Sequence, residues 1–418
     1  MDKSSIKFGI KNGFLHIFSA NMINKIVQFG TTIVLVRVLS KTDYGNYTYA
    51  LNILSMFLLL KGMGVDSGIL QYCSETDDRE RKLKYFRYGI KIGLVANVVI
   101  AIAIYIYTSL FELPIKASTP ILRTLFLLPL VTIIFECLIV FYRADYKNKI
   151  FSTLSVINAI ALFVGSIVLG NLFGIKGVVF ARYFAFVISV IIGVYFFKEY
   201  FKDFKKVETP NRPDKNKFLK YSITCSLTNA ISQMLFLIDT FLVGLIIKDT
   251  NVVAAYKTAT LIPFNLLFIP TSIIVFVYPY FAKNYNNKKW IKEKFITLQK
   301  YLFFFNTIIS LILIIFAKPF ILLVFGENYM DALVPFRILM FGYIVAGSFR
   351  APAGNILASI KKVKVNFYNA IITGIANIIL DVILIYKYGS NGAAVATVLV
   401  FIITSIISNT YLFRYLKE

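Results

Sequence analysis

The sequence has few charged residues: Asp, Glu, Lys and Arg make up 16% of its 418 residues, against roughly 25% in ordinary soluble domains. A soluble chain of this length would need about two or three domains with polar surfaces, and the residues for those surfaces are missing. The apolar share of 58% excludes an intrinsically disordered chain. The composition therefore predicts a polytopic membrane protein.

Residues that carry catalysis or bind metals are also scarce. Cys73, Cys137 and Cys225 are far apart and lack metal-ligand spacing, and His16 is the only histidine. The chain has no HExxH motif, no Gly-rich phosphate loop after a strand and no GxSxG motif. We therefore expect no disulfide scaffold, no enzyme, no metal and no cofactor.

The net charge is +24, which in a soluble protein would suggest a nucleic-acid partner. Here the basic residues lie in short clusters between apolar runs and form no continuous basic face. Loop charges that set membrane orientation explain this pattern. We therefore expect no nucleic-acid partner.

Apolar segments of about 20 residues, long enough to cross a bilayer as helices, recur twelve times. They lie at about 13–37, 44–62, 87–108, 120–142, 152–172, 177–197, 219–246, 253–280, 299–317, 332–357, 366–387 and 392–413. The longest connection, 198–218, contains Pro210 and Pro213 at the midpoint of the chain. This predicts two lobes of six helices, residues 1–208 and 209–418.

Lysine and arginine in the predicted loops indicate the orientation. Of the 45 Lys and Arg residues, 30 lie in loops on the side of the N-terminus and seven in the opposite loops. We therefore expect a multi-pass protein of the cytoplasmic membrane with both termini in the cytoplasm.

Two short patterns repeat between the halves. GIKGVVFA at 174–181 resembles GSNGAAVA at 389–396, and Tyr47–Ala50 aligns with Tyr256–Ala259. Each pair occupies the same place among the predicted spans. Two halves with an even number of spans share one orientation, so we predict a parallel repeat, an all-α fold of about twelve transmembrane helices in two lobes.

Basic residues inside the spans are candidates for binding an anionic substrate, because ionisable groups in a membrane usually face a cavity. Lys61 and Lys91 lie near span ends, where they fit an anchoring role better. Lys25 shares a helix face with Asn21 and Gln28, which forms a polar stripe. The candidate substrate-binding residues are Lys25, Lys257, Arg350, Arg123, Arg182 and Arg337. For the last three, which lie one to two turns inside the outer face, anchoring fits equally well.

The acidic residues inside the spans are Glu136, Asp239 and Asp381, which are candidates for ion coupling. Asp239, deep in the seventh span, fits either a buried ion pair with a base or a carboxylate that exchanges a proton during transport. Because bases outnumber acids inside the spans, an anionic ligand would supply the missing charge. Pro352, two residues after Arg350, predicts either a static kink or a mobile, substrate-lining segment.

The segment LVRVLSKTDYG at 35–45 carries a family resemblance. We expect Thr42 to cap the following helix and Asp43 to lie in its first turn. With DTFLVG at 239–244 and the Gly-Ala pattern at 388–396, it resembles the polysaccharide-biosynthesis flippases. These are the Wzx-type O-antigen and capsule repeat-unit transporters of the multidrug/oligosaccharidyl-lipid/polysaccharide exporter superfamily.

The resemblance implies a V-shaped transporter with alternating access. Its substrate would be an undecaprenyl-diphosphate-linked oligosaccharide, moved from the cytoplasmic to the outer leaflet for O-antigen, capsule or exopolysaccharide assembly. Its partners would be this lipid-linked substrate, the lipid bilayer and, as further candidates, a polysaccharide polymerase and glycosyltransferases.

Two alternatives stay open. One is a cation-coupled multidrug or metabolite antiporter of the same superfamily. The other is a membrane-embedded polysaccharide polymerase or ligase, which would need a large outer loop with catalytic Arg or His. The longest predicted outer loop, 318–331, is short and largely apolar.

Overall fold

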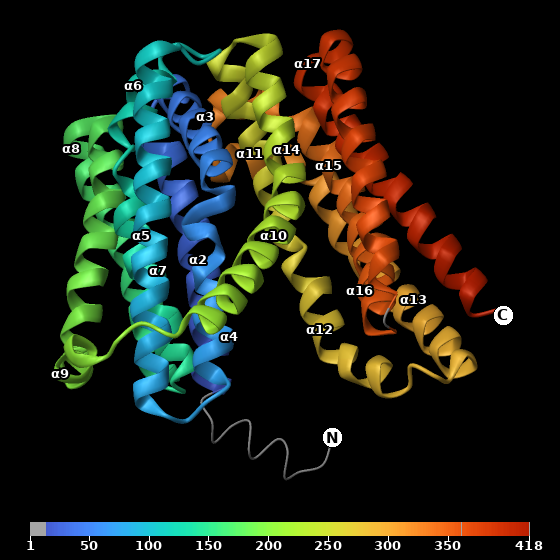
Figure 1. Cartoon of the computed structure of the whole chain (residues 1–418). Coiled ribbons are helices and arrows are strands. Elements are labelled where there is room, and N and C mark those ends of the chain that lie inside the picture. The colour runs from blue at the N-terminus through green and yellow to red at the C-terminus, as the bar shows by residue number, and fades with distance from the viewer. Residues whose placement is uncertain (1–13, 361, 418) are drawn as a thin grey trace. The chain divides into compact units, whose positions relative to one another are not determined.

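The computed structural model describes residues 14–360 and 362–417, and these residues are almost entirely helical, without a β-strand (Figure 1). The predicted all-α fold is confirmed. The chain divides into two compact units, Met1–Met234 and Leu235–Glu418. The predicted lobes with a boundary at 208/209, and their V-shaped arrangement, stay predictions.

The helices of the first unit follow one another with short connections. They are α2 (Phe14–Val38), α3 (Lys41–Phe57), η1 (Leu58–Gly64), α4 (Val65–Ser74), α5 (Arg79–Leu110), α6 (Ser118–Thr124), α7 (Leu128–Ala144), α8 (Asn148–Phe196) and α9 (Lys198–Lys206). Ser40 caps α3, since its hydroxyl accepts the Asp43 amide at 3.0 Å. The prediction of Thr42 as the cap is wrong because the helix already begins at Lys41. Asp43 lies in the first turn, as predicted.

The second unit contains most of the remaining elements. They are α10 (Arg212–Ile247), α11 (Thr250–Leu266), α12 (Phe268–Lys283), α13 (Lys288–Ile315), α14 (Ala317–Val324), η2 (Glu327–Ala332), α15 (Leu333–Val345), η3 (Ala346–Arg350), α16 (Ala351–Ser359) and α17 (Val363–Tyr415). The first part of α10 packs in the first unit instead. Phe218 is fully buried there and stacks on Tyr85, with ring centroids 5.9 Å apart.

The two longest helices, α8 and α17, are helical hairpins. Gly174 in α8 has φ 56° and ψ −136°, and Gly389 in α17 has φ 60° and ψ −139°. A Cβ atom on Gly177 would lie 1.8 Å from the carbonyl oxygen of Leu169, and one on Gly392 would lie 2.0 Å from that of Leu384. Both repeats of the predicted pattern therefore form the same tight turn, which needs glycine at both positions.

Matching hydrogen bonds hold the arms of each hairpin together. In α8 the Asn158 amide donates to the Ala185 carbonyl at 3.1 Å and to the Ser189 hydroxyl at 3.2 Å. In α17 the Asn369 amide donates to Thr404 and Ser408 in the same way, at 3.1 and 2.7 Å. This shared geometry supports the predicted internal repeat.

Seven of the described helices are long and apolar enough to cross a membrane, and nine are if each sharply bent pair counts as one span. Each helical hairpin is counted once there, although each covers two predicted spans. Helix α2, which matches the first predicted span, is not among the nine. The count of twelve transmembrane helices stays a prediction.

Helix α9 is fixed to the ends of α5 and α7 by polar contacts. The Tyr200 hydroxyl donates to Asp145, which also forms an ion pair with Lys82 at 2.7 Å. Burial, together with the neighbouring Asp145 carboxylate, raises the pKa of Tyr200, so its hydroxyl stays a donor. These contacts attach the start of the 198–218 connection to the first unit.

Candidate functional site

Two carboxylates lie buried together in the second unit. Asp239 on α10 is 4% exposed and Asp381 on α17 is fully buried. Asp239 accepts hydrogen bonds from Thr397 at 2.7 Å, from Asn377 at 3.2 Å and from Tyr256 at 3.4 Å. We call these five residues the acidic cluster. It brings together two of the three predicted ion-coupling residues.

The acidic cluster has unused oxygen atoms. Asn377 donates to both carboxyl groups, to Asp381 at 3.1 Å and to Asp239 at 3.2 Å, and the two carboxyl groups interact electrostatically. Within the described part of the chain, Oδ1 of Asp381 and Oδ1 of Asn377 are buried without a hydrogen-bond partner. Two carboxylates this close need a proton or a cation between them. The arrangement can therefore hold either one.

The donors to Asp239 are neutral side chains. Lys257 on α11 interacts with it electrostatically, but among the described residues Asp239 forms no ion pair with a base. The predicted binding residue Lys257 thus lies near the acidic cluster, and no direct ion pair with Asp239 cancels its charge.

Arg350 lies among aromatic rings of the same unit. Its guanidinium carbon is 4.9 Å from the ring centroid of Phe401 and 5.9 Å from that of Phe236. These cation–π contacts stabilise a positive charge without cancelling it. Among the described residues Arg350 forms no ion pair with a carboxylate.

A turn of π-helix, η3, sets the position of Arg350. The Asn306 amide donates to the Ser348 hydroxyl at 3.0 Å, and the Asn409 amide donates to the Phe349 carbonyl at 3.2 Å. Pro352 follows within the first turn of α16. Side chains from α13 and α17 therefore hold this turn in place, by one bond to a side chain and one to the backbone. Turns of π-helix often occur at functional sites.

Three other predicted arginines have partners at separate places. Arg123 donates to the Thr108 carbonyl near the end of α5, and Arg337 donates to the Ile314 carbonyl near the end of α13 at 3.3 Å. Arginine stabilises helix C-termini in this way. Arg182 donates to the Tyr47 hydroxyl and lies over its ring, 5.6 Å from the centroid.

Lys25 is exposed on α2 in the first unit. Of the predicted polar stripe, Gln28 is exposed as well, whereas the side chain of Asn21 lies outside the described residues, as does that of His16. Lys257 and Arg350 belong to the other unit. A shared role of the three cations stays a prediction.

Glu136, the third predicted ion-coupling residue, lies on α7 and forms an ion pair with Lys61 at 2.5 Å. The ammonium group of Lys61, interpreted from the sequence as a membrane anchor, pairs with another span at a break in the second span; the anchoring role stays a prediction.

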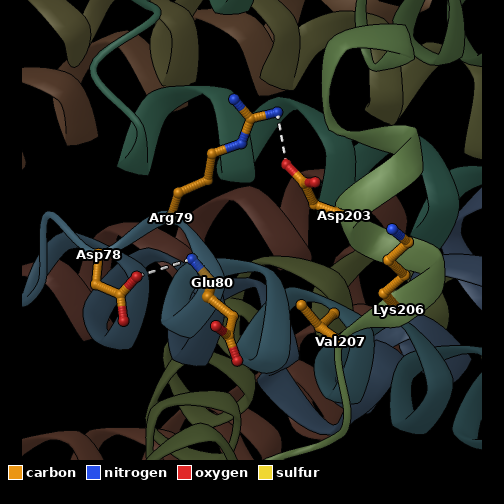
Figure 2. A pocket seen from close by; sticks show the side chains of 6 residues that line it. All are labelled: Asp78, Arg79, Glu80, Asp203, Lys206 and Val207. Atoms are coloured by element: carbon orange, nitrogen blue, oxygen red, sulfur yellow. Dashed lines mark hydrogen bonds and ion pairs between the residues drawn. The ribbon is translucent and has the colours of Figure 1, made fainter.

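A surface pocket of about 510 Å³ lies between the start of α5 and the end of α9 (Figure 2). An ion pair of 3.0 Å joins Arg79 and Asp203 across it, and its other polar side chains are Asp78, Glu80 and Lys206. None of the predicted site residues lines this pocket, so we place the candidate site in the spans.

Comparison with known proteins decides the family. Residues 10–285, more than half of the chain, match the family described as polysaccharide biosynthesis protein. The chain belongs to the polysaccharide biosynthesis protein family. Residues 225–383 also match the MatE family, in line with a common superfamily.

Relatives of this family member match along nearly the whole chain. The capsular polysaccharide biosynthesis protein CapF of Staphylococcus aureus is 23% identical over 414 residues, which cover 97% of this chain and 99% of CapF. An inward-facing multidrug resistance MATE family transporter of the MOP superfamily has a similar structure, with a TM-score of 0.81, 12% identity and coverage of 96% and 98% of the two chains.

The lipid II flippase MurJ in an inward closed conformation is also similar, with a TM-score of 0.74 and 20% identity, covering 96% of this chain and 87% of MurJ. At these identities the structures establish the fold alone. With its apolar helices, the match makes this polysaccharide biosynthesis protein an integral membrane protein with the fold of MOP-superfamily transporters.

Sequence reasoning missed part of the acidic cluster in this family member. Asn377 carried a signal, because it lies four residues before Asp381 and so shares a helix face with it. Thr397 carried none beyond its place one residue after the repeated pattern at 389–396.

Proposed function

We propose that the protein is a flippase for undecaprenyl-diphosphate-linked oligosaccharide repeat units. It would move them from the cytoplasmic to the outer leaflet of the cytoplasmic membrane for surface polysaccharide assembly. The sugar head group crosses in a wet cavity while the lipid tail stays in the bilayer.

The observation that carries this proposal is Arg350. It is a cation held by aromatic faces, and within the described chain no carboxylate pairs with it. Phosphate oxygens accept strong charge-assisted hydrogen bonds from arginine and lysine, and low polarity strengthens that attraction. A diphosphate is thus the kind of group for which Arg350 and Lys257 are suited.

In this mechanism the acidic cluster couples transport to a cation. Asp239 and Asp381 hold a proton or a monovalent cation in one state of the transporter and release it in another. Because the acidic cluster lies beside Lys257, its charge alters how strongly that lysine attracts an anion. Ion binding at the acidic cluster and substrate binding at Lys257 would thereby be coupled, and the ion gradient would drive substrate transport.

Deletion of the gene tests the proposed function. We expect loss of surface polysaccharide together with accumulation of lipid-linked repeat units in the cytoplasmic leaflet, because synthesis continues while transfer stops. Leaflet location is measured by access of a membrane-impermeant sugar-modifying reagent. Polysaccharide loss without such accumulation would favour a polymerase or ligase instead.

The orientation is tested by reporter fusions. Since 30 of 45 Lys and Arg residues lie on the side of the N-terminus, fusions after residues 210 and 290 should report the cytoplasm. Fusions after residues 115 and 325 should report the outside. An external signal at 210 would reverse the orientation and with it the proposed direction.

A further inference from the structure

The second candidate span, Lys41–Ser74, is interrupted in its middle. In η1, Lys61 is extended with φ −51° and ψ 133°, and Gly62 and Met63 have φ 55° and 53°. A left-handed methionine is strained. Non-helical backbone at membrane depth is tolerated only where it is buried in protein or lines a water-filled cavity.

Neighbouring helices hold this break in place. The Gly62 amide donates to Oδ1 of Asn97 at 2.6 Å, and the Asn97 amide donates to the Pro129 carbonyl at 2.6 Å. A Cβ atom on Gly62 would lie 2.6 Å from Cδ1 of Ile133. Helices α5 and α7 therefore fix the backbone beside Lys61, so the break is a built feature.

The break brings Lys61 to Glu136, and the pair is only partly satisfied. The Lys61 and Glu136 side chains are 38% and 24% exposed, and Nζ is 2.5 Å from Oε1. Oε2 of Glu136 is buried and has no hydrogen-bond partner within the described chain. The other titratable groups that act on Lys61 are Asp66 on α4 and the Cys137 thiol. Lys61 thus keeps an open side and faces an excess of negative charge.

The second unit has no such break at the corresponding place, which lies within the described residues. The offset of 209 residues between Tyr47 and Tyr256 aligns Lys61 with Pro270, but Leu267, where α11 meets α12, keeps helical angles of φ −58° and ψ −16°, and Thr250–Ile274 is one candidate span. The interrupted backbone is therefore a feature of the first unit at these two aligned places.

We propose that Lys61 binds a phosphate group of the transported substrate and that Glu136 is the internal ligand which this phosphate displaces. The exchange breaks the Lys61–Glu136 contact and forms the Lys61–phosphate contact, Lys61 stays protonated, and the freed Glu136 carboxylate takes up one proton that the buffer releases. No other bond forms or breaks. This step rests on the proposed function and adds to Arg350 and Lys257 a further anion-binding residue, in the first unit.

Uptake of a proton follows from the charges around Lys61. With Glu136 and Asp66 both ionised, the surroundings of Lys61 carry more negative than positive charge and repel an anion. Neutralising Glu136 removes one negative charge and leaves Lys61 without its partner. Phosphate binding and protonation of Glu136 therefore favour each other.

The experiment is calorimetric titration of the purified full-length protein with inorganic pyrophosphate, in two buffers of different ionisation enthalpy at pH 7. The wild type should take up about one proton per bound ligand. Glu136→Gln should bind at least as tightly with no uptake, and Lys61→Ala should bind about tenfold or more weakly. Wild-type binding without proton uptake, or absence of binding, overturns the proposal.

A charge exchange separates this role from a structural ion pair. Lys61→Glu/Glu136→Lys restores opposite charges, so a purely structural pair would give back both thermal stability and pyrophosphate binding. We expect thermal stability to return while pyrophosphate binding stays weak. In the exchanged variant the lysine is attached to α7 at position 136, so its ammonium group is no longer held at the backbone break. Recovery of binding and transport overturns the proposal.

Two further experiments identify the ligand and separate this inference from the proposed function. With vesicles that contain undecaprenyl diphosphate, Lys61→Ala should bind more weakly than the wild type. An equal loss of binding with phosphatidylglycerol vesicles overturns the diphosphate assignment. If Arg350→Leu abolishes pyrophosphate binding while Lys61→Ala leaves it unchanged, the Lys61 inference fails and the proposed function stands. The opposite pattern supports Lys61 and removes Arg350 from the site.

Discussion

Arg350→Leu is expected to reduce transport on the order of 10- to 100-fold, the effect of losing one hydrogen-bonded contact to a charged group. The leucine fills the space between Phe236 and Phe401 with an apolar side chain, so folding and membrane insertion should persist. Surface polysaccharide in a flippase-deficient strain is the measure, with the amount of inserted protein determined in parallel.

Matched variants show whether the charge matters or only the packing. Arg350→Lys keeps the charge and should retain part of the activity, whereas Phe401→Leu keeps the charge but removes the ring 4.9 Å away. Arg337→Ala is the control from the same unit, since Arg337 is exposed and donates to a helix end. Its effect should be mild. Full activity of Arg350→Leu would remove Arg350 from the mechanism.

Lys25 and Lys257, the other two basic residues predicted deep in the spans, are expected to affect transport in the same way as Arg350. Lys25→Ala and Lys257→Ala should also impair transport, and Lys25→Arg should keep more activity than Lys25→Ala, because arginine also donates to phosphate. Lys91→Ala should be milder, as expected for an anchor near a span end. Full activity of all the alanine variants would contradict substrate binding by these basic residues, and only the fold and family assignments would stand.

The helical fold and the repeat were accessible from the sequence because they depend on local patterns. Runs of apolar residues predict helices whatever their neighbours are. The Gly-x-x-Gly pattern predicted that 174–181 and 389–396 are equivalent, and the matching backbone angles of Gly174 and Gly389 agree with this. Both positions demand glycine, so the pattern survives in the sequence as a recognisable signal.

Pairs of side chains from distant segments could not be predicted. Asp239 lies 138 residues from Asn377 and 158 from Thr397, so no spacing rule connects them. The same holds for Lys61 and Glu136, 75 residues apart. Burial cost indicates that such ionisable groups need partners, but only the packing of helices determines which partners they have.

The break at Lys61 could not be predicted for a different reason. Hydropathy averages over a window, so a span interrupted for a few residues has the same score as a continuous helix. Gly62 and Gly64 carried a signal, since glycine inside a helical pattern often marks an irregular backbone. Without the break, Lys61 is placed near a helix end and its role is taken for anchoring.

The second large effect is expected for Asp239→Asn, which should abolish transport driven by an ion gradient while leaving insertion intact. Asparagine keeps the shape and can still accept a hydrogen bond from the Thr397 hydroxyl, but it removes one of the two carboxylates that are proposed to hold the ion. Asp239→Glu should be partly active. Transport by the Asn variant at the wild-type rate would exclude Asp239 from coupling.

Thermal unfolding in detergent identifies the ion. A cation that binds only the folded protein raises its stability by about 2.7 kcal/mol at 100 times Kd. The Tm of the wild type should therefore rise with sodium at constant ionic strength if the ion is sodium, or with falling pH alone if it is a proton. Glu293→Gln, which changes an exposed acid of the same unit, should respond like the wild type.

The stability of the Asn variant distinguishes ion coupling from a structural role for Asp239. If Asp239 were half of a buried ion pair, its loss would leave a base unpaired and destabilise the protein by about 3–5 kcal/mol. Its hydrogen-bond donors are instead neutral, and among the described residues Lys257 acts on it electrostatically without forming an ion pair, so Asp239→Asn mainly removes the repulsion between the two carboxylates. We expect a Tm equal to or above that of the ion-free wild type and no response to the ion. A large loss of Tm would show that the acidic cluster serves folding, and the coupling step would then have to be sought at Glu136.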